Sequence, residues 1–506
     1  MFYFCVAGFN FGGSAGTSHR NQRHDGCYTT SPAGTNGLRR CHEWTSMKLS
    51  QSHLILLMKM FILFLLVAYS TARLAAQTMT TLVQFDGTNG SSPFTMIQGS
   101  DGNFYGLTAE SIFKMSPQGS LTTLTNLQFV SSFGVYPMSG LIQGKDGNFY
   151  GVRGFYNSGT NYASIFKMAA EGSLTVLTNF EVAFGAGGLT QGSDGNFYGA
   201  MQWGMDSSSH GSIFKMTPDG ALTTLVNFNG TNGDVPNAPP IQANDGNFYG
   251  TTVGSDNAIS YPFDSYVGTI YKMTPDGTLT TLFAFDGTNG ISSYSCLIQA
   301  NDGNLYGTTD GTIFKTTLDG TLTTLATFNI TNGSELGSLI QASDGNFYGT
   351  ASVGGNLSTN GYTSYGTIFK MTPDGTLTTL FSFNGTNGYF PYGSLVQATD
   401  GNLYGVTSYG GNLSVQNGGG YGDGTVFKIT GLNLLPSFQS ITLTNGNIRL
   451  AWNSVSNWTY RVQYKTNLTD ASWTDLPGDV LATNVIAGKT DPATPAQRFY
   501  RLVLLR

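Results

Sequence analysis

The residue types that carry out most enzymatic chemistry are scarce in this sequence of 506 residues. Four of its five histidines precede residue 77, which leaves His210 for the rest of the chain. A Ser-His-Asp triad built on His210 is formally possible, but no Gly-x-Ser-x-Gly elbow follows residue 76. Because serines 207–209 and Gly211 flank it, we expect His210 to be a solvated loop residue.

Carboxylates alone could support glycoside hydrolysis, which needs an acid and a base or nucleophile. Candidates outside the repeated turns are Glu110, Glu181, Asp206, Asp234, Asp256, Asp264, Glu335 and Asp423. No two of them form a recognisable catalytic pair, so we predict no catalytic residue and an enzyme only as the alternative.

Metal chemistry has few ligands available after residue 76. His210 and Cys296 are the histidine and cysteine of that part of the sequence, which excludes zinc or copper sites built from several such residues. The recurrent Asp-Gly-Asn lacks the ligand density of a calcium loop. We therefore predict no metal and no cofactor, and we expect Cys296 to be a small buried hydrophobic residue.

The charge content argues against nucleic acid as a partner. Only 10% of the residues are charged, and residues 77–506 carry 16 basic against 27 acidic side chains. Binding to phosphates requires clustered Lys and Arg. Binding functions that use aromatic and amide side chains fit this composition better.

A repeated unit accounts for most of the chain. The motif Gln-x-x-Asp-Gly-Asn-(Phe/Leu)-Tyr-Gly occurs seven times, beginning at Gln98, Gln143, Gln191, Gln242, Gln299, Gln341 and Gln397. Each copy is followed by Ile-Phe-Lys-Met or a variant of it, and six copies continue into a run such as Leu-Thr-Thr-Leu. The missing seventh run stands at residues 79–85, ahead of the first motif.

These signals predict an all-β chain. In the sixth copy, residues 338–342, 346–350, 368–372 and 377–383 read as four antiparallel strands, with Asp-Gly turns after the first and third. Seven such units predict a seven-bladed β-propeller over residues 77–430. A ring explains why the array begins and ends in mid-unit, because the N-terminal strand then completes the last blade and closes the circle.

Two residues per unit account for much of the remaining charge. We predict a structural ring of paired or hydrogen-bonded groups near one rim. Its lysines are Lys114, Lys167, Lys215, Lys272, Lys315, Lys370 and Lys428, and its turn aspartates are Asp101, Asp146, Asp194, Asp245, Asp302, Asp344 and Asp400.

Function is expected on the opposite face, where the second-to-third-strand loops and the connections between units lie. These loops vary in length and carry exposed aromatic residues suited to glycans or protein partners. The candidate ligand-binding residues are Tyr156, Tyr162, Trp203, Tyr261, Phe263, Tyr362, Tyr365, Tyr409 and Tyr421. In the alternative reading, these aromatics only pack their own loops over the blades.

Both ends of the chain differ from the repeats. Residues 58–76 have the charge, apolar run and small residues of a signal peptide, with cleavage expected after Ala76, and residues 1–57 read as an over-extended start or unstructured leader. We therefore predict a secreted or cell-surface monomer without a membrane span after cleavage. Residues 435–506 predict a fibronectin-III-like or immunoglobulin-like sandwich, with strands at 448–452, 460–464 and 499–503.

The repeat also resembles a known family. The segments 339–350 and 366–380 resemble the GloVer tandem repeat of bacterial "choice-of-anchor" proteins, and in strand order the units resemble NHL-type propeller blades. The resemblance covers residues 80 to 430 and implies an exported bacterial protein, but no catalytic residue. The leading hypothesis is an exported, non-enzymatic binding or cell-envelope module whose C-terminal domain serves attachment or sorting. The alternative is a secreted carbohydrate-active hydrolase or lyase.

Overall fold

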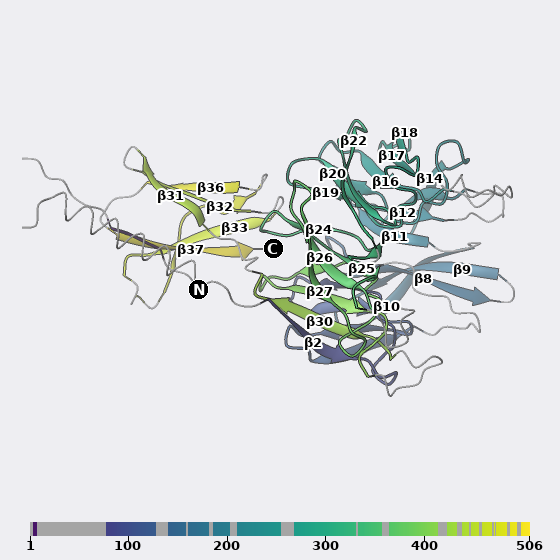
Figure 1. Cartoon of the computed structure of the whole chain (residues 1–506), viewed down its shortest axis with the longest axis horizontal. Helices are drawn as coiled ribbons and strands as arrows, with labels where there is room; N and C mark the ends of the chain where they lie inside the picture. The colour runs from purple at the N-terminus through teal and green to yellow at the C-terminus, as the bar shows by residue number, and fades with distance from the viewer. Residues whose placement is uncertain are drawn as a thin grey trace, which may run out of the picture. The chain divides into compact units, whose positions relative to one another are not determined.

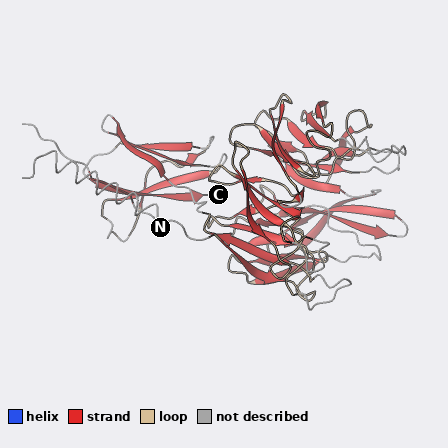
Figure 2. Ribbon diagram, viewed as in Figure 1, coloured by secondary structure: helices blue, strands red, loops and turns tan. Residues whose placement is uncertain are grey.

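The structure is a computed structural model of the chain. It describes residues 4–7, 77–127, 140–157, 160–181, 186–202, 210–254, 268–329, 332–356, 364–412, 422–432, 438–444, 447–454, 458–467, 470, 472–482, 486–492 and 497–505. Within these ranges every regular element is a β-strand and none is a helix (Figure 2). No helix in this part of the chain could therefore cross a membrane. The predicted all-β class is confirmed.

Four-stranded antiparallel sheets follow one another along the chain (Figure 1). The first contains β3 (Thr95–Gln98), β4 (Phe104–Leu107), β5 (Ser111–Met115) and β6 (Leu121–Asn126). The second contains β7 (Ile142–Gln143), β8 (Phe149–Asn157), β9 (Thr160–Met168) and β10 (Leu174–Glu181). The third contains β11 (Ala186–Gln191), β12 (Phe197–Met201), β13 (Ser212–Met216) and β14 (Leu222–Asn227).

The pattern continues through the second half of the array. The fourth sheet contains β15 (Ile241–Gln242), β16 (Phe248–Thr251), β17 (Thr269–Met273) and β18 (Leu279–Ala284). The fifth contains β19 (Ile298–Gln299), β20 (Leu305–Thr308), β21 (Thr312–Thr316) and β22 (Leu322–Thr327). The sixth contains β23 (Ser334–Leu336), β24 (Ile340–Gln341), β25 (Phe347–Val353), β26 (Thr367–Met371) and β27 (Leu377–Ser382).

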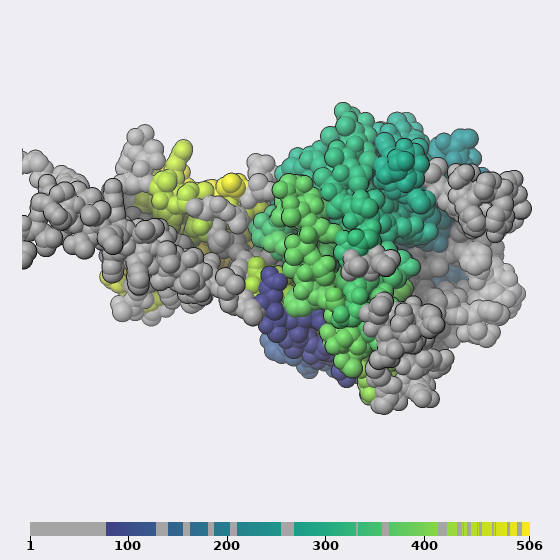
Figure 3. Space-filling model, viewed as in Figure 1, coloured from purple at the N-terminus to yellow at the C-terminus, as the bar shows by residue number. Residues whose placement is uncertain are grey.

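The seventh sheet combines the two ends of the array. It contains β28 (Val396–Gln397), β29 (Leu403–Thr407), β30 (Thr425–Thr430) and, as the partner of β30, the N-terminal β2 (Thr78–Gln84). Thr78 lies opposite Thr430 and Gln84 opposite Thr425. In the space-filling view, the purple residues of β2 lie against the green residues of the last sheets (Figure 3).

The sequence of each unit explains its strands. Asp-Gly turns connect the first two strands, and their glycines adopt positive φ, as Gly345 does at 81°. The Tyr-Gly of the second strand lies under the phenyl ring of the third, so that a Cβ at Gly405 would lie 2.4 Å from Cζ of Phe427. Second strands are buried on both faces, as in β20, because neighbouring sheets pack against them.

A repeated glutamine contact connects neighbouring sheets. In each case Oε1 of the motif glutamine accepts a hydrogen bond from a backbone N–H in the first turn of an adjacent sheet. The donor and acceptor residues are Ser100 and Gln143, Lys145 and Gln191, Ser193 and Gln242, Asn244 and Gln299, Asn301 and Gln341, Ser343 and Gln397, and Thr399 and Gln98. We call the seven motif glutamines the glutamine ring. The last pair joins the seventh sheet to the first.

The C-terminal region has a core of its own. One sheet contains β31 (Phe438–Thr444), β32 (Asn447–Asn453) and β36 (Ile486–Asp491). In a second sheet, β33 (Thr459–Lys465) pairs with β34 (Thr474–Asp475), β35 (Val480–Leu481) and β37 (Gln497–Leu505). Trp452, Tyr460, Val462 and Tyr500 are fully buried in the core that these sheets share. The three predicted strands are present and longer than expected.

The N-terminal 76 residues lie almost entirely outside the described ranges. The strand described there is β1 (Phe4–Ala7). The predicted leader and signal peptide therefore remain sequence-based predictions.

The sixth copy also tests the predicted strand boundaries. Three of its strands match closely, but the first, predicted over residues 338–342, is the two-residue β24. The segment before it stays next to β25, since Gly337 N–H bonds to Thr350 O at 2.9 Å, but the pairing shifts by one residue between Leu336, opposite Ala351, and Ile340, opposite Tyr348.

Candidate functional site

A cavity of about 650 Å³ lies where the first strands of the sheets begin. Every one of the seven sheets contributes to its wall, through the first strand itself or the connection that precedes it. The wall includes Ile97, Ile142 and Val396, each of which directly precedes a glutamine of the glutamine ring. Pockets of about 300–1,000 Å³ are typical of small-molecule sites.

The position of the cavity in the strand order fixes the face on which it opens. First strands run from the cavity toward the Asp-Gly turns, so the cavity lies at the end of the sheets away from those turns. Gln202 and Tyr409, which follow the second strands β12 and β29, also line it. It therefore opens on the face that carries the second-to-third-strand loops and the inter-sheet connections.

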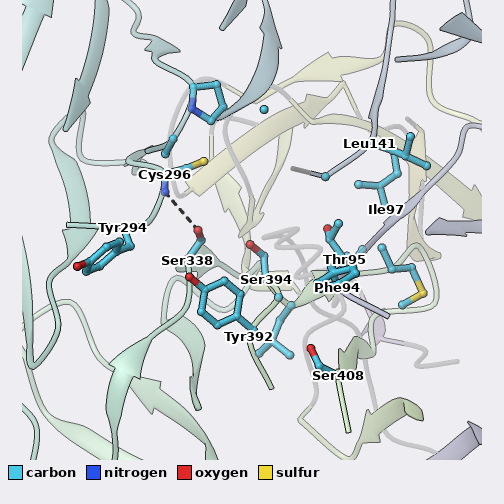
Figure 4. A pocket seen from close by; sticks show the side chains of 18 of the residues that line it. Phe94, Thr95, Ile97, Leu141, Tyr294, Cys296, Ser338, Tyr392, Ser394 and Ser408 are labelled. Atoms are coloured by element: carbon cyan, nitrogen blue, oxygen red, sulfur yellow. Dashed lines mark hydrogen bonds between the residues drawn. The ribbon is translucent and has the colours of Figure 1, made fainter. Parts of the chain in front are cut away.

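Aromatic side chains form one side of the cavity, which we call the aromatic rim. They are Phe94, Tyr294, Phe390, Tyr392 and Tyr409. Tyr294 and Tyr392 are 47% and 50% exposed, high values for aromatic side chains in a wall. Figure 4 shows Phe94, Tyr392 and Ser338 gathered around the cavity.

Several aromatic rings of the rim contact one another. Phe390 and Tyr392 are parallel within 3°, with centroids 6.1 Å apart, and Phe390 also contacts Tyr409 at 6.2 Å. Tyr389 continues the cluster toward Tyr365, at 5.7 Å and edge to face. Phe390 adopts a positive φ of 60° and its N–H bonds to Tyr365 O at 3.2 Å. The neighbouring rings and this hydrogen bond therefore hold Phe390 in a backbone conformation that costs free energy.

The polar side of the cavity consists of amides and hydroxyls. Gln202 Nε2 donates to Asn237 Oδ1, and Asn237 Nδ2 donates to Tyr294 O at 3.0 Å. Ser338 Oγ accepts from Cys296 N at 3.3 Å. None of the described lining residues is charged. The wall can therefore exchange hydrogen bonds with a ligand in both directions without presenting a net charge.

Two carboxylates lie near the aromatic rim. Glu335 N–H bonds to Asp310 O at 3.0 Å, and Asp310 N–H to Ser292 O at 3.2 Å, two residues before Tyr294. Partial burial raises the pKa of Asp310, and the charge of Glu335 raises it further. The pKa of Tyr392 is raised by partial burial and then by nearby groups that include Glu335 and Asp310. Among the described residues, neither carboxylate forms an ion pair.

The predicted ligand-binding residues are only partly brought together. Tyr409 lines the cavity and Tyr365 belongs to the adjoining aromatic cluster. Tyr162 lies in the long hairpin of β8 and β9, opposite Phe155, and is half-buried outside the cavity wall. Tyr156 lies in β8, but its side chain is not described. The remaining candidates lie outside the described residues: Trp203, Tyr261, Phe263, Tyr362 and Tyr421.

Sequence reasoning missed the inter-sheet connections that supply most of the rim. Tyr294, Tyr392 and Asn237 each stand five residues before a motif glutamine, so they share one position of the repeat. That shared position was a usable signal. It is weak in the sequence, because only two of the seven units have an aromatic residue there.

The prediction for His210 was wrong. Its Nδ1 lies 2.7 Å from Oδ2 of Asp234, whose side chain is 4% exposed. His210 O also accepts the N–H of Val235 at 3.0 Å. The imidazole ring of His210 therefore fixes the connection between the third and fourth sheets and is not a solvated loop side chain.

Cys296 lines the cavity, and the residue as a whole is partly exposed. Burial of the thiol raises its pKa to about 11, so that the reactive thiolate is rare at neutral pH. No group of three or more His, Cys, Asp or Glu side chains in the described ranges could hold a metal ion.

The lysine and aspartate of every unit lie together. Their Nζ to Oδ2 distances range from 2.8 Å at Lys315 to 3.2 Å at Lys272. The motif tyrosine joins each pair, as Tyr306 does by donating its hydroxyl to Asp302 Oδ2 at 2.9 Å. Lysine nitrogens also lie 5.1 to 5.7 Å from the centroids of these tyrosine rings. We call each set a Lys–Asp–Tyr unit.

Hydrogen bonding in these units favours ionised aspartate. Partial burial opposes ionisation of Asp101, but the hydrogen bonds from Asn103, Lys114 and Tyr105 outweigh it and lower the pKa to about 2. The pKa of Asp245 falls to about 2 in the same way. The groups of each unit pair with one another, and the units lie at the end of the sheets away from the cavity.

Comparison with protein families decides what kind of chain carries this site. The model of the Gloeobacter/Verrucomicrobia repeat matches residues 68–261, 185–355 and 259–471 in three overlapping segments. The chain belongs to this family. The resemblance seen in the repeat motif is therefore confirmed.

Several solved structures are similar to this Gloeobacter/Verrucomicrobia repeat protein at low sequence identity. A streptogramin B lyase is 16% identical with a TM-score of 0.47, over 71% of this chain and 99% of that one. Virginiamycin B lyase from Staphylococcus aureus is 13% identical with a TM-score of 0.46, over 70% and 99%. The extracellular domain of a hybrid two-component system from B. thetaiotaomicron is 11% identical with a TM-score of 0.42, over 85% and 56%. No curated protein matches.

For this repeat family member, the architecture is all-β, with four-stranded antiparallel sheets repeated along the chain. Similarity at these levels of identity carries no information on substrate or activity. The cavity is therefore the feature that points to a function.

Proposed function

We propose that this protein is an exported, non-enzymatic binding module that holds a glycan or protein segment in the cavity of its repeat array. In this proposal the seven sheets are the blades of one closed seven-bladed β-propeller, with β2 closing the ring. The glutamine contact between Thr399 and Gln98 supports closure, because it repeats the contact made at every other junction.

The observation that carries the proposal is the cavity itself. It combines an aromatic rim, an uncharged polar wall and a volume of about 650 Å³ at the point where all seven sheets converge. Concave sites lined by aromatic groups and a few convergent polar groups are the usual form of ligand sites. The rest of the array repeats one structural pattern, whereas the cavity wall differs from sheet to sheet.

Export and attachment complete the proposal. The signal-like segment at residues 58–76 would direct secretion, and the C-terminal sheets, which we propose form a fibronectin-III-like or immunoglobulin-like sandwich, would serve attachment or sorting. The protein would then act as a monomer at the cell surface or outside the cell.

An array of glycans and envelope polymers, probed with the full chain lacking its signal peptide, tests the binding function. We expect binding without turnover that falls at least tenfold in Tyr392→Ala. Val176→Ala, which removes another exposed side chain of the array on the strand β10, serves as the control and should bind normally. Binding that is equal in all three proteins would contradict the proposed site.

A second candidate function rests on Asp310 and Glu335. One carboxyl with a raised pKa beside another carboxyl is the arrangement that glycosidases use for acid and base catalysis. Release of reducing sugar from any array ligand, lost in both Asp310→Asn and Glu335→Gln, would establish a hydrolase. Binding with no release in the wild-type protein would exclude it.

A further inference from the structure

The aromatic rim offers a flat apolar surface to an entering ligand. Phe390 and Tyr392 lie on either side of Pro391 in the chain and present parallel rings, and Tyr392 is half-exposed. Sugar rings present a face of C–H groups, which can pack on such rings while their hydroxyls remain free to hydrogen bond. A rim of this kind selects ligands by their flat apolar faces.

The wall beyond the rim suits hydroxyl groups. Asn237, Gln202, Ser338 and Ser394 supply amide and hydroxyl groups that both donate and accept. Apolar residues such as Leu141, Ile97 and Val396 line the part of the cavity next to the glutamine ring. A ligand that alternates apolar faces with hydroxyls fits this sequence of surfaces better than a uniformly apolar one.

The two carboxylates near the aromatic rim limit which sugars the cavity can bind. Asp310 N–H bonds to Ser292 O, two residues before Tyr294, and Glu335 stands three residues before Ser338, so both carboxylates belong to segments that line the cavity. An acidic sugar such as a uronate would meet repulsion there and find no lysine or arginine among the described lining residues. Uncharged sugars avoid this penalty.

The depth of the cavity restricts which part of a chain can enter. Its wall begins at the inter-sheet connections and ends at Ile97, Ile142 and Val396, just before the glutamine ring. The ring glutamines also bond back to the turns of their own sheets, as Gln299 Nε2 does to Gly303 O at 2.9 Å. A polymer therefore approaches from one face and reaches the interior with its end.

We propose that the cavity receives the terminal, uncharged sugar units of a glycan chain, which enter end-first from the face where the first strands begin. This inference rests on the proposed binding function and names its ligand class and its mode of entry. It predicts recognition of chain ends in place of recognition along the chain.

The test uses the full chain without its signal peptide and isothermal titration calorimetry. The probes are cello-, xylo- and mannohexaose, each also with the 4-hydroxyl of its non-reducing unit capped as a bulky ether or its reducing end coupled to a bulky amine. Oligogalacturonate hexamer provides the anionic arm. We expect at least one neutral hexaose to bind, one of its two caps to weaken binding at least tenfold, and oligogalacturonate not to bind.

Three variants connect the result to the cavity. Tyr392→Ala should weaken binding of the neutral hexaose at least tenfold, whereas Tyr392→Phe, which keeps the ring, should retain it within about threefold. Glu335→Gln should bring oligogalacturonate binding into the measurable range. Thermal unfolding of each variant checks that the fold is kept.

The outcomes separate this inference from the proposed function. Neutral hexaose binding that neither cap changes would overturn end-first entry. Binding of oligogalacturonate alone, still lost in Tyr392→Ala, would overturn the ligand class and leave the binding module intact. Binding that ignores Tyr392→Ala, or no binding in any arm, would overturn both.

Discussion

Each repeat places its few charges in one contact between the third strand and the first turn. Asp302 accepts hydrogen bonds from Asn304, Tyr306 and Lys315, all within 3.1 Å, and both ends of the ion pair remain about a third exposed. Exposed ion pairs contribute little, whereas loss of several hydrogen bonds at one acceptor costs more. The aspartate should therefore matter more than the lysine.

We expect Lys315→Met to lower the free energy of unfolding by about 0.5–1 kcal/mol. Asp302→Ala should lower it by about 2 kcal/mol, because it removes the acceptor of the whole unit. Urea unfolding of both variants checks these values. If Lys315→Met left stability unchanged, the lysine would have no structural role; if it cost more than Asp302→Ala, the assigned hierarchy would be wrong.

The same aspartates predict how stability depends on pH. The pKa is lowered in the folded state at Asp101, Asp146, Asp194, Asp245, Asp302 and Asp400. A carboxyl with a depressed folded-state pKa stabilises the fold above its unfolded pKa of about 3.9, and this contribution disappears as the pH falls toward the folded value.

Melting temperature should therefore be nearly constant from pH 7 to 5 and fall steeply between about pH 4 and 2, near the folded pKa of about 2 at Asp101. Differential scanning calorimetry across this range measures it. Asp302→Asn should make the decline shallower. A melting temperature that rose on acidification would contradict the assigned direction.

At the residue scale, repetition made structural roles easier to predict than functional ones. Lysine and aspartate recur seven times in fixed register, so their pairing could be expected from sequence. Tyr392 and Tyr294 recur only twice at their shared position, and the partner of His210 lies 24 residues further along the chain. Contacts of that kind depend on how a connection folds back, which local sequence does not encode.

At the scale of elements, the N-terminal strand is the most informative piece. Phe85 follows β2, is fully buried, and packs with Val83, Met96 and Phe104 in a cluster that joins the first and seventh sheets. Phe328 occupies the corresponding position after β22 and is 7% exposed. The two residues therefore form a matched pair.

Phe85→Ala should cost about 3–5 kcal/mol, as should Phe328→Ala, since each leaves a cavity between neighbouring sheets. Denaturant unfolding monitored by tyrosine fluorescence compares the two. A cost below about 1 kcal/mol for Phe85→Ala, with the usual loss for Phe328→Ala, would show that β2 is peripheral and does not complete the seventh sheet.

Strand positions were predictable where hydrogen-bonded turns limit them. The Asp-Gly turns and the Ile-Phe-Lys-Met runs placed the second, third and fourth strands within a few residues. The first strand of the sixth sheet was predicted too long because its regular pairing with β25 is interrupted between β23 and β24. Gly337 N–H, for example, bonds to Thr350 O in the gap between β23 and β24.

At the scale of the whole molecule, the repeats and the C-terminal sheets have separate hydrophobic cores. Trp452 is fully buried in the C-terminal core with Tyr460 and Tyr500. Domains with their own cores unfold as separate units unless a large interface couples them. Calorimetry of the full chain should therefore resolve two transitions.

Trp452→Ala should lower one transition by at least 10 °C, because it removes a large buried ring, and leave the other within about 1 °C. Phe328→Ala should have the opposite effect. A single transition that moves in both variants would show that the two cores unfold together.

The fold class could be predicted from the whole sequence because seven copies make the pattern unmistakable. The cavity could not, since its wall takes one or a few residues from every sheet and no segment contains enough of it to be recognised. The aromatic rim, for example, combines Phe94 with Tyr392, nearly three hundred residues later. Such convergence is a property of the assembled array.

The pairing of β2 with β30 also bears on the order of the repeats in the gene. Thr78 lies opposite Thr430, so the array starts and stops at neighbouring points, and the junction from Thr399 to Gln98 has the same bond as the others. A gene cut between any two other repeats, with Thr430 joined to Thr78 by a short linker, would encode the same set of contacts. The choice of starting repeat therefore does not change the contacts of the array, and circularly permuted chains should fold alike.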